Sequence, residues 1–399
     1  MKEKTIAIAS SGLGHVARGI EAWAHDLGQA LAERGLPVIV CKGGGEPQAD
    51  YERVVRCWTR ESPQAKNTLA RLPRFLGWRL GMGNGYGVEQ ATYAWNLIKV
   101  LRKERVGLLH VQDPQVALYV QRARRLGWLK TKTILAHGTE EPLDFQRKIT
   151  YLQHLAPWHL EESRAAGVWK PTWTAIPNFI DTSLFRPGQS PELRRELDIP
   201  PNALVVLVAA AIKRNHKRVD YLLDEFAALL QRRPDLPIYL VIAGGWEPET
   251  DELVAEGKRR LGDRVRFLVR FPRSRMPDLY RAADLFVLGS LKEMMPIALL
   301  EGAASGLPCL VHEHPVMAWM VGPGGKTIDM AASGALACEL EQMAGCEGER
   351  RNLGSLAQQH CLQNFSREAV VDQILDYYGR VMNTPAKAEA SAASEQACV

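Results

Sequence analysis

The stretch of residues 284–312, DLFVLGSLKEMMPIALLEGAASGLPCLVH, constrains the fold more than any other part of the chain. It begins with an apolar run, Leu285–Leu288, of the length expected for a buried parallel strand. After a polar turn, Pro296 suits the first position of a helix, and Gly306 suits the residue just after its end. Residues 307–311 predict the next strand. Such a unit places the helix N-terminus at the carboxyl edge of a parallel sheet.

This helix N-terminus has the features of an anion site. The free backbone N–H groups of Met294, Met295 and the first helical turn point out of the helix end, where the macrodipole favours negative charge. Glu293 precedes the helix and Glu301 lies in its second turn, and a carboxylate can accept two hydrogen bonds from a vicinal diol. The pattern therefore fits a nucleotide diphosphate-sugar. An amphipathic helix with two solvent-facing glutamates is the alternative interpretation.

Four cations follow the first strand of the second half of the chain. Leu204–Ala209 is an apolar run, and the next nine residues, AAIKRNHKR, contain Lys213, Arg214, Lys217 and Arg218. At a strand's carboxyl end these side chains would lie where a diphosphate binds, with arginine clamping two oxygens and lysine acting as a point charge. A basic surface turn is the other interpretation.

A glycine-containing turn follows the first strand of the chain, which is predicted at residues 4–10. Gly12 and Gly14 would let the backbone approach a donor phosphate or an acceptor. The third glycine of a dinucleotide fingerprint is missing, and Cys41-Lys42 stand where an acidic residue would end the second strand. The pattern therefore argues against NAD binding.

Length and composition indicate a two-domain globular chain. It has 399 residues, of which 46% are hydrophobic and 24% charged, and no apolar run approaches the roughly 20 residues of a membrane span. The sequence enters a strand at once without a signal-peptide pattern, and its seven cysteines show no CxxC pairing, so we expect a reduced, cytoplasmic protein. Residues 1–180 carry a net charge of +9 and the rest −4. The basic half suits an anionic acceptor or membrane surface, or is simply a solvated face.

Two segments of the first half leave alternatives open. Residues 43–92 hold three glycine-rich or basic-aromatic stretches before a helix predicted at 88–104, and we interpret them as a mobile acceptor-side lid or as a long surface connection. Residues 122–130, RARRLGWLK, are basic with interleaved apolar side chains. They suit a peripheral contact with an anionic membrane at its inner, cytoplasmic face, or a solvated helix end.

Two motifs resemble one known family. The stretch SLKEMMPIALLEGAASGLP resembles the E-x7-E signature of the family-4 retaining glycosyltransferases, also called glycosyltransferase group 1, which have the GT-B fold. Residues 172–187, with IPNFID and FRP, resemble the interdomain linker of that family. The resemblance implies an α/β architecture with two Rossmann-like domains that face each other across a cleft, and a C-terminal helix that crosses back to the N-terminal domain.

The resemblance also implies roles for individual residues. Glu293 would contact the donor sugar and Glu301 the ribose diol, while Lys217 would stabilise the diphosphate leaving group. His137, at the end of a strand predicted at 131–136, resembles the family's cleft histidine, which contacts the donor sugar. Family members usually carry an arginine five residues before the phosphate lysine, but that position holds Ile212, so Lys213 or Arg214 would have to replace it. Further candidates are Gly244 and Arg270 for the donor, and His15 and Asp113 for the acceptor.

The expected domain boundaries follow the same resemblance. Residues 1–180 form the acceptor-side domain, to which the C-terminal helix at 366–383 returns, and residues 181–365 form the donor domain. Residues 384–399, rich in Ala, Ser and Glu without apolar periodicity, are expected to be a disordered tail.

The predicted activity is transfer of a sugar, with retention, from a UDP- or GDP-linked donor to an acceptor hydroxyl of a glycan, lipid or small molecule. It would serve bacterial glycan, glycolipid or glycosylated natural-product synthesis. We expect no metal, since the chain has no Asp-x-Asp pair, no cofactor besides the nucleotide-sugar co-substrate, and no nucleic-acid partner. Two alternatives remain: a nucleotide-sugar epimerase of the same fold, and a catalytically degenerate sugar-nucleotide-binding partner protein, for which Ile212 and Phe179 are the supporting departures.

Overall fold

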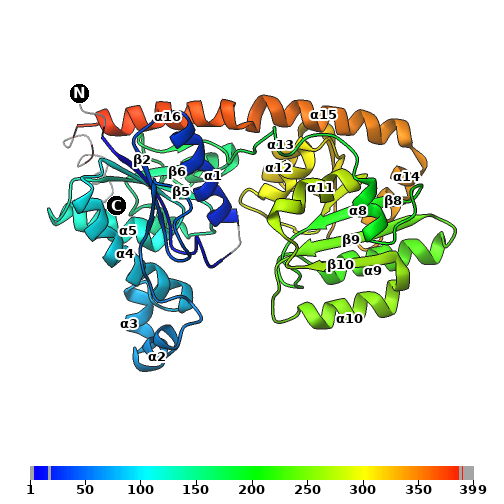
Figure 1. Cartoon of the computed structure of the whole chain (residues 1–399), viewed down its shortest axis with the longest axis horizontal. Helices are drawn as coiled ribbons and strands as arrows, with labels where there is room; N and C mark the ends of the chain where they lie inside the picture. Colours follow the sequence, from blue (N-terminus) through cyan, green and yellow to red (C-terminus); the bar gives the residue numbers. More distant parts are fainter. Residues whose placement is uncertain (1–3, 17–18, 386–388, 390–399) are drawn as a thin grey trace. The chain divides into compact units, whose positions relative to one another are not determined.

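The chain forms two compact α/β units (Figure 1). The computed structural model describes residues 4–16, 19–385 and 389. Unit 1 contains the described residues up to Pro177 and those from Val371 onward, and unit 2 is Asn178–Val370. The first boundary falls inside the IPNFID motif, and the second falls inside the helix α16, Arg367–Asn383. The α/β architecture expected from the sequence is confirmed.

Unit 1 is built on a seven-stranded sheet whose strand order is β3-β2-β1-β4-β5-β6-β7, with all pairs parallel. Its strands are β1 (Ile6–Ser10), β2 (Val38–Lys42), β3 (Glu52–Val54), β4 (Leu108–Val111), β5 (Lys132–His137), β6 (Tyr151–His154) and β7 (Thr174–Ala175). Its helices, besides α16, are α1 (Gly19–Glu33), α2 (Pro63–Arg71), α3 (Arg74–Arg79), α4 (Gly85–Lys103), α5 (Pro114–Arg125), α6 (Leu143–Gln146) and α7 (Pro157–Ala165).

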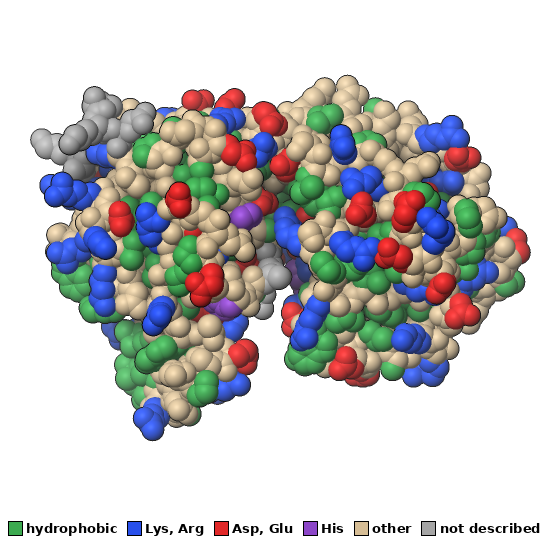
Figure 2. All heavy atoms as spheres, in the orientation of Figure 1, with side chains coloured by type: hydrophobic (Ala, Val, Ile, Leu, Met, Phe, Trp, Pro, Cys, Tyr) green, Lys and Arg blue, Asp and Glu red, His purple; other side chains and the backbone are tan. Residues whose placement is uncertain are grey.

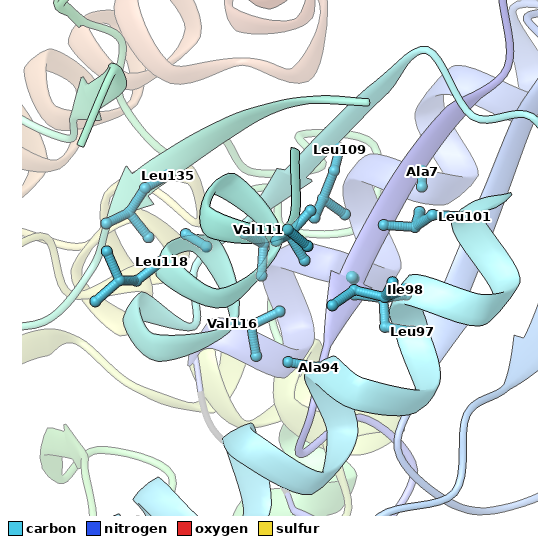
Figure 3. Packing of buried hydrophobic residues seen from close by; sticks show 14 of the residues in the cluster. Ala7, Ala94, Leu97, Ile98, Leu101, Leu109, Val111, Val116, Leu118 and Leu135 are labelled. Carbon is cyan, nitrogen blue, oxygen red and sulfur yellow. The ribbon is translucent and has the colours of Figure 1, made fainter. Parts of the chain in front are cut away.

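The two faces of this sheet pack against different helices, because successive strand residues point to opposite sides. On one face, Ala7, Leu109 and Leu135 pack against apolar residues of α4 and α5 (Figure 3). On the other face, α1 lies so close to the sheet that a Cβ added to Gly28 would be 2.1 Å from Val40 Cγ2. Burial on both faces explains why most of these strands are continuous apolar runs.

Unit 2 has a six-stranded sheet with the order β10-β9-β8-β11-β12-β13, again with all pairs parallel. Its strands are β8 (Leu204–Ala209), β9 (Ile238–Gly244), β10 (Val265–Val269), β11 (Leu285–Leu288), β12 (Cys309–His312) and β13 (Gly325–Ile328). Its helices are α8 (Pro191–Glu196), α9 (Val219–Arg232), α10 (Thr250–Leu261), α11 (Met276–Ala282), α12 (Ile297–Ala304), α13 (Pro315–Val321), α14 (Ala335–Gly345) and α15 (Glu347–Phe365). The apolar sides of α9 and α14 cover one face of β8, β9 and β11.

Residues 43–92 are not a long connection without secondary structure, and their role as an acceptor-side lid remains a prediction. This segment contains β3, α2, α3 and the first turns of α4. Helices α2 and α4 each begin with a capping side chain, since Ser62 accepts from Ala65 N and Asn84 accepts from Gly87 N. These caps were recognisable in the sequence, but the glycines and cations around them favoured a loop.

The C-terminal helix α16 packs on unit 1 from Val371 onward. Tyr378 is 1% exposed, and its hydroxyl oxygen lies 2.7 Å from Nδ1 of His110 in β4. The His110 ring also meets the Trp23 ring edge-on. Ser366 caps the helix, because its hydroxyl oxygen accepts from Ala369 N.

The disordered tail expected at residues 384–399 is contradicted at Glu389. The side chain of Glu389 is 9% exposed, and its carboxylate forms ion pairs with Arg124 at 2.6 Å and Lys132 at 3.0 Å. It also accepts a hydrogen bond of 2.6 Å from the Tyr151 hydroxyl. Residues 386–388 and 390–399 lie outside the described residues.

Because His110 is buried, we expect unit 1 to lose stability as the pH falls. Burial lowers the pKa of His110 from 6.5 to about 3. The unfolded chain therefore binds a proton below pH 6.5 that the folded chain does not, so stability falls as the pH falls from 6.5 toward 3. We expect His110→Asn to reduce the stability lost between pH 7 and pH 5 by about 2 kcal/mol, measured from urea unfolding midpoints at both pH values. An unchanged pH dependence would show that His110 is not responsible.

Candidate active site

The two loops that follow β8 and β11 bring Lys217 and Glu293 together at the carboxyl edge of the unit 2 sheet. Lys217 Nζ donates a hydrogen bond to Glu293 Oε1, and the Ser290 hydroxyl donates to the same oxygen at 2.6 Å. His216 Nε2 lies 3.6 Å from Oε2 of this carboxylate. Glu293 is 7% exposed. Its carboxylate is held in one position by these partners, which come from the two loops.

Helix α12 begins beside this pair with an uncapped N-terminus. Pro296 is the N-cap residue, with φ −74° and ψ 115°, and no side chain caps the helix. The sequence placed Pro296 one residue further along, at the first helical position, which is incorrect because its ψ is still extended. Gly306 follows the helix with φ +78°, as expected from its position. Met295 is 6% exposed, and its Sδ atom accepts from the backbone N of Asn178 at 3.1 Å, whereas Met294 is half-buried.

Glu301 is buried on α12 and has two partners from neighbouring elements. Its Oε2 accepts from the Tyr280 hydroxyl at 2.8 Å, and its Oε1 accepts from Arg273 Nη1 at 3.2 Å. Burial, and then the charge of Glu301, raise the pKa of Tyr280 well above 10, so this hydroxyl remains a donor. Glu301 is 4% exposed and Glu293 7%, so the alternative of two solvent-facing glutamates is wrong.

The four cations of the loop after β8 do not act as one group. Arg214 Nη2 pairs with Glu252 and Glu256 of α10, each at 3.0 Å. Arg218 has φ +51° and donates to the carbonyl oxygens of Gly289 at 3.2 Å and Met330 at 2.9 Å. Lys217 faces Glu293. Lys213 forms no ion pair among the described residues, and its side chain is half-buried.

Ile212 is a core residue and not a surface position. It is fully buried among the apolar side chains between β8 and α9. Its backbone N donates to Gly245 O at 3.1 Å, and its carbonyl accepts from the Thr250 hydroxyl at 2.9 Å. The position that usually holds the family's arginine therefore contributes to packing in this chain.

Gly244 and Arg270 lie at the ends of the neighbouring strands β9 and β10. A Cβ at Gly244 would be 1.7 Å from the carbonyl oxygen of Ala210, so only glycine fits this close approach. Arg270 has φ +56°, its backbone N donates to Gly244 O at 2.7 Å, and its guanidinium lies 5.7 Å from the centre of the Trp246 ring. Their proposed contact with the donor remains a prediction.

Unit 1 has a separate polar cluster at the carboxyl ends of β1 and β4. Asp113 accepts from the Ser11 backbone N at 3.1 Å, the Ser11 hydroxyl at 2.6 Å and the Tyr86 hydroxyl at 2.9 Å. His15 Nε2 lies 3.2 Å from Glu89 Oε2, and the Ser11 hydroxyl links the two carboxylates by a 3.4 Å bond to Glu89 Oε1. The structure thus brings His15 and Asp113 into one network, although they do not touch each other.

Glu89 is the centre of this cluster, and the sequence analysis missed it together with Arg60 and Tyr86. Arg60 donates to Glu89 from its backbone N at 2.8 Å, from Nε at 3.2 Å and from Nη2 at 2.6 Å. Burial raises the pKa of Glu89, but hydrogen bonds from His15 and Arg60 outweigh it and lower the pKa to about 2. Burial raises the pKa of Asp113, although its donors act in the opposite direction.

The glycines of the loop after β1 pack against their own chain. A Cβ at Gly12 would be 2.1 Å from Glu21 Oε1, and one at Gly14, which has φ +97°, would be 2.0 Å from Gly44 O. The close approach that was expected toward a ligand is therefore made to α1 and to the glycines after β2. Contact of Gly12 and Gly14 with a donor remains a prediction.

His137 ends β5 inside a group of three buried histidines. Its ring centre lies 5.5 Å from that of His154 and 6.5 Å from that of His159. His137 is 3% exposed, its Nε2 lies 3.4 Å from the backbone N of Glu141, and its Nδ1 has no hydrogen-bond partner among the described residues. Burial, and then the proximity of His159, lower the pKa of His137 to about 3, so the ring is neutral at pH 7.

Residues 189–360 match the family model described as "Glycosyl transferases group 1". This segment belongs to the group 1 glycosyltransferases. The match spans nearly all of unit 2, including Lys217, Glu293 and Glu301, and confirms the family that the E-x7-E motif and the linker indicated.

Curated relatives of the group 1 glycosyltransferase segment are similar over about half of their length. The D-inositol 3-phosphate glycosyltransferase of Corynebacterium aurimucosum is 30% identical over 215 residues, which are 51% of this chain and 50% of that protein. The protein of the same name from Salinispora tropica is 33% identical over 205 residues, which are 47% of this chain and 41% of that protein. The chain thus spans about half the length of the curated relatives it matches.

Solved structures extend the similarity of fold to nearly the whole chain. Sucrose-phosphate synthase from Thermosynechococcus elongatus has a TM-score of 0.75 at 20% identity, covering 95% of this chain and 99% of that one. HepE from Anabaena, in its complex with UDP-glucose, has a TM-score of 0.72 at 16% identity, and the match covers 94% of this chain and 100% of HepE. The fold is therefore GT-B, with two Rossmann-like α/β domains.

Proposed function

We propose that this chain is a retaining glycosyltransferase that moves a sugar from a UDP- or GDP-linked donor to an acceptor hydroxyl, in the synthesis of a bacterial glycan, glycolipid or glycosylated natural product. One observation carries the proposal. In the group 1 segment, Lys217 and Ser290 hold the buried carboxylate of Glu293 beside the uncapped N-terminus of α12. A cation and a helix N-terminus together suit a diphosphate, and the adjacent carboxylate suits a sugar hydroxyl.

The proposed chemistry uses Lys217 and α12 to stabilise the leaving group. An ammonium has three donor hydrogens, so Lys217 can keep its bond to Glu293 while it donates to a phosphate oxygen. Negative charge on the departing diphosphate grows as the glycosidic bond to it breaks, and fixed donors aimed at that charge lower the barrier. These groups supply the charge stabilisation without a metal, and the chain lacks an Asp-x-Asp pair.

Two further donor contacts and one histidine belong to the proposal. Glu301 accepts hydrogen bonds from the ribose diol, since each of its oxygens has more than one lone pair. The backbone around Gly244 and Arg270 lies next to the nucleotide. His137 Nδ1, which has no hydrogen-bond partner among the described residues, binds a hydroxyl of the donor sugar.

The acceptor is proposed to bind at the polar cluster of unit 1, near His15 and Asp113. This cluster lies at the carboxyl edge of a parallel sheet, where ligands of α/β proteins usually bind. Its carboxylates and histidine suit a polyhydroxylated acceptor. Because curated relatives are named D-inositol 3-phosphate glycosyltransferases, inositol phosphate belongs in the first acceptor panel.

We expect Lys213, and not Arg214, to be the second cation, besides Lys217, that binds the diphosphate of the donor. Arg214 already pairs with Glu252 and Glu256, whereas Lys213 has no ion-pair partner among the described residues. Lys213→Ala should weaken UDP or GDP binding about tenfold, which is a typical loss for one charge-assisted hydrogen bond, while Arg214→Ala should change it less than about threefold. Calorimetric titration of both variants checks this, and the reverse order of effects would contradict it.

The proposed function is tested with a panel of nucleotide-sugars. A donor present at about 100 times its dissociation constant stabilises the folded chain by about 2.7 kcal/mol, which a thermal shift assay detects. The best donor is then offered to the acceptor panel, and the anomeric configuration of the product is read by NMR. Binding without transfer to any acceptor would favour the non-catalytic partner protein, and an altered free nucleotide-sugar would favour the epimerase.

A further inference from the structure

Helix α3 and its flanks carry apolar side chains that have no place in the core. Phe75 is 71% exposed, Trp78 63%, Leu80 44% and Leu76 36%. Single exposed apolar residues are normal, but four within six consecutive positions form a patch, and such patches usually mark a binding surface. Figure 1 shows that α2 and α3 extend away from the sheet of unit 1. We call residues 71–80 the α3 surface.

The α3 surface is also strongly basic. Arg71, Arg74 and Arg79 are exposed, and none forms an ion pair within the part of the chain that the structure describes. No aspartate or glutamate occurs in residues 62–88, which contain these arginines and Lys66. Figure 2 shows hydrophobic and basic side chains together on the part of unit 1 formed by α2 and α3. The charge of this surface therefore complements an anionic partner.

The backbone of the α3 surface and the Trp78 side chain pack against their own chain. A Cβ added to Gly83 would lie 2.4 Å from Trp78 Cδ2, so the indole packs directly on the backbone of the turn before α4. The Tyr119 hydroxyl of α5 donates to the carbonyl oxygen of Leu80. Buried Gly77 lets the helix pack closely against Met82, because a Cβ there would be 3.3 Å from the Met82 carbonyl oxygen. The Trp78 ring is thus held against its own chain while 63% of the residue stays exposed.

A second aromatic and basic group occurs on the next two helices. The rings of Trp95 in α4 and Trp128 after α5 meet edge to face, with their centres 6.2 Å apart. Trp95 is 58% exposed and Trp128 is 47% exposed. Lys99 lies 5.9 Å from the centre of the Trp95 ring, and Leu126 is 67% exposed. This group includes part of the basic stretch 122–130, in which the sequence analysis recognised the same combination. Tryptophan is enriched where a protein meets the headgroup region of a bilayer.

We propose that the α3 surface docks unit 1 on an anionic phospholipid bilayer. The Phe75 and Trp78 rings enter the boundary between headgroups and acyl chains, and the three arginines bind lipid phosphates. A protein partner fits less well, because ten residues supply far less area than the roughly 800 Å² per partner of a stable protein interface. The contact is peripheral, and no helix in the described residues is long and apolar enough to cross a bilayer.

The proposal is tested by sedimenting the full chain with vesicles in the absence of any nucleotide-sugar, so that its outcome is independent of sugar transfer. We expect binding to phosphatidylcholine vesicles that contain ~30% phosphatidylglycerol, and little binding to phosphatidylcholine alone, with the difference lost at high salt. Arg74→Gln/Arg79→Gln should lower the partition coefficient roughly 25-fold, because each charge near an anionic surface contributes about fivefold. Phe75→Ser/Trp78→Ser should abolish binding to vesicles.

Matched controls separate this surface from general charge and hydrophobicity. Lys258 and Arg259 on α10 are exposed cations without an ion pair among the described residues, so Lys258→Gln/Arg259→Gln removes the same charge from unit 2. Trp158, 42% exposed on α7, provides the aromatic control Trp158→Ser. Both controls should bind vesicles like the wild type. Wild-type protein that ignores anionic vesicles, or α3 variants that bind as well as the controls, would overturn the proposal.

Fluorescence quenching by brominated lipids adds a direct readout of insertion. Brominated phosphatidylcholine mixed into the anionic vesicles should quench part of the wild-type tryptophan fluorescence. Trp78→Phe should keep the binding but lose most of that quenching. Equal quenching of Trp78→Phe and wild type would overturn the placement of Trp78 in the bilayer. Self-association through the α3 surface without vesicle binding would instead identify a second copy of the chain as the partner.

Discussion

Replacing Glu293 by alanine is expected to lower kcat/KM for sugar transfer by at least about a thousandfold. The substitution removes the carboxylate that Lys217 and Ser290 hold in place, and with it the proposed contact to the donor sugar. It also leaves the Lys217 ammonium, which is proposed to bind the diphosphate, without the partner that fixes its position. The loss should appear mainly in kcat, because both effects act on the transition state.

Two comparisons make this result specific to Glu293. Glu293→Gln keeps the size of the side chain and an oxygen for Lys217, so it should fold like the wild type and still lose most activity. Glu313→Ala, which removes a glutamate that follows the neighbouring strand β12 and has no ion pair in the described residues, should retain activity. Circular dichroism and nucleotide binding show whether each variant is folded. Turnover like that of the wild type in Glu293→Ala would remove this residue from the mechanism.

Replacing Glu89 by alanine is expected to give the largest loss of stability, about 3–5 kcal/mol. The Glu89 side chain is fully buried and accepts hydrogen bonds from Arg60 and Ser11, with His15 at 3.2 Å. Without it, the guanidinium of Arg60, whose side chain is only 13% exposed, loses the carboxylate to which it donates its hydrogen bonds. Hydrogen exchange of the β1 and β4 amides measures the opening of unit 1 by itself.

Acid should remove the stability that Glu89 contributes to the wild-type protein. The pKa of Glu89 is about 2 in the folded chain and 4.5 as its ordinary value, so its stabilising effect is complete above pH 4.5 and is lost as the pH falls through about 2. Glu61→Ala is the matched control, because the Glu61 side chain is 82% exposed and its removal should cost less than about 0.5 kcal/mol. A similarly small effect of Glu89→Ala would show that the cluster does not stabilise unit 1.

The sequence predicted unit 2 in more detail than unit 1 for a physical reason. Strands buried on both faces are continuous apolar runs, so Leu204–Ala209 and Leu285–Leu288 were both recognised with their correct ends. In unit 1, by contrast, Tyr151–His154 was missed, because two of its four residues are Gln153 and His154. Both are fully buried polar side chains, and their partners, the Ile176 carbonyl and the Ser163 hydroxyl, lie 23 and 9 residues further along the chain.

The candidate site residues also fall into those that the sequence could indicate and those that only the structure brings together. Glu293, Glu301 and Lys217 stand in local motifs, so the resemblance to the family could single them out as candidates without knowledge of the fold. Glu89 and Arg60 could not be singled out in this way, since their pairing depends on how α4 packs on the sheet. One signal was present nevertheless. Glu89 and Gln90 lie four residues before Tyr93 and Ala94, on the apolar side of α4, where a buried carboxylate requires a counter-charge.

Ile212 shows what the sequence alone could not decide. A missing arginine at that position suggested either a degenerate protein or a shifted cation. The structure shows that Ile212 packs in the core, that Arg214 is paired with α10, and that Lys213 has no ion-pair partner among the described residues. The choice between Lys213 and Arg214 depends on the contacts of Arg214 with Glu252 and Glu256, which lie 38 and 42 residues away in sequence.

A crystal structure of the chain with UDP or GDP would show whether the diphosphate binds between Lys217 and α12. We expect a diphosphate within hydrogen-bond distance of Lys217 Nζ and of the backbone N–H groups in the first turn of α12. The ribose should contact Glu301, and Lys213 should lie closer to the phosphates than Arg214. A nucleotide bound elsewhere, with the loop after β8 and the start of α12 left without ligand, would contradict the proposed donor site.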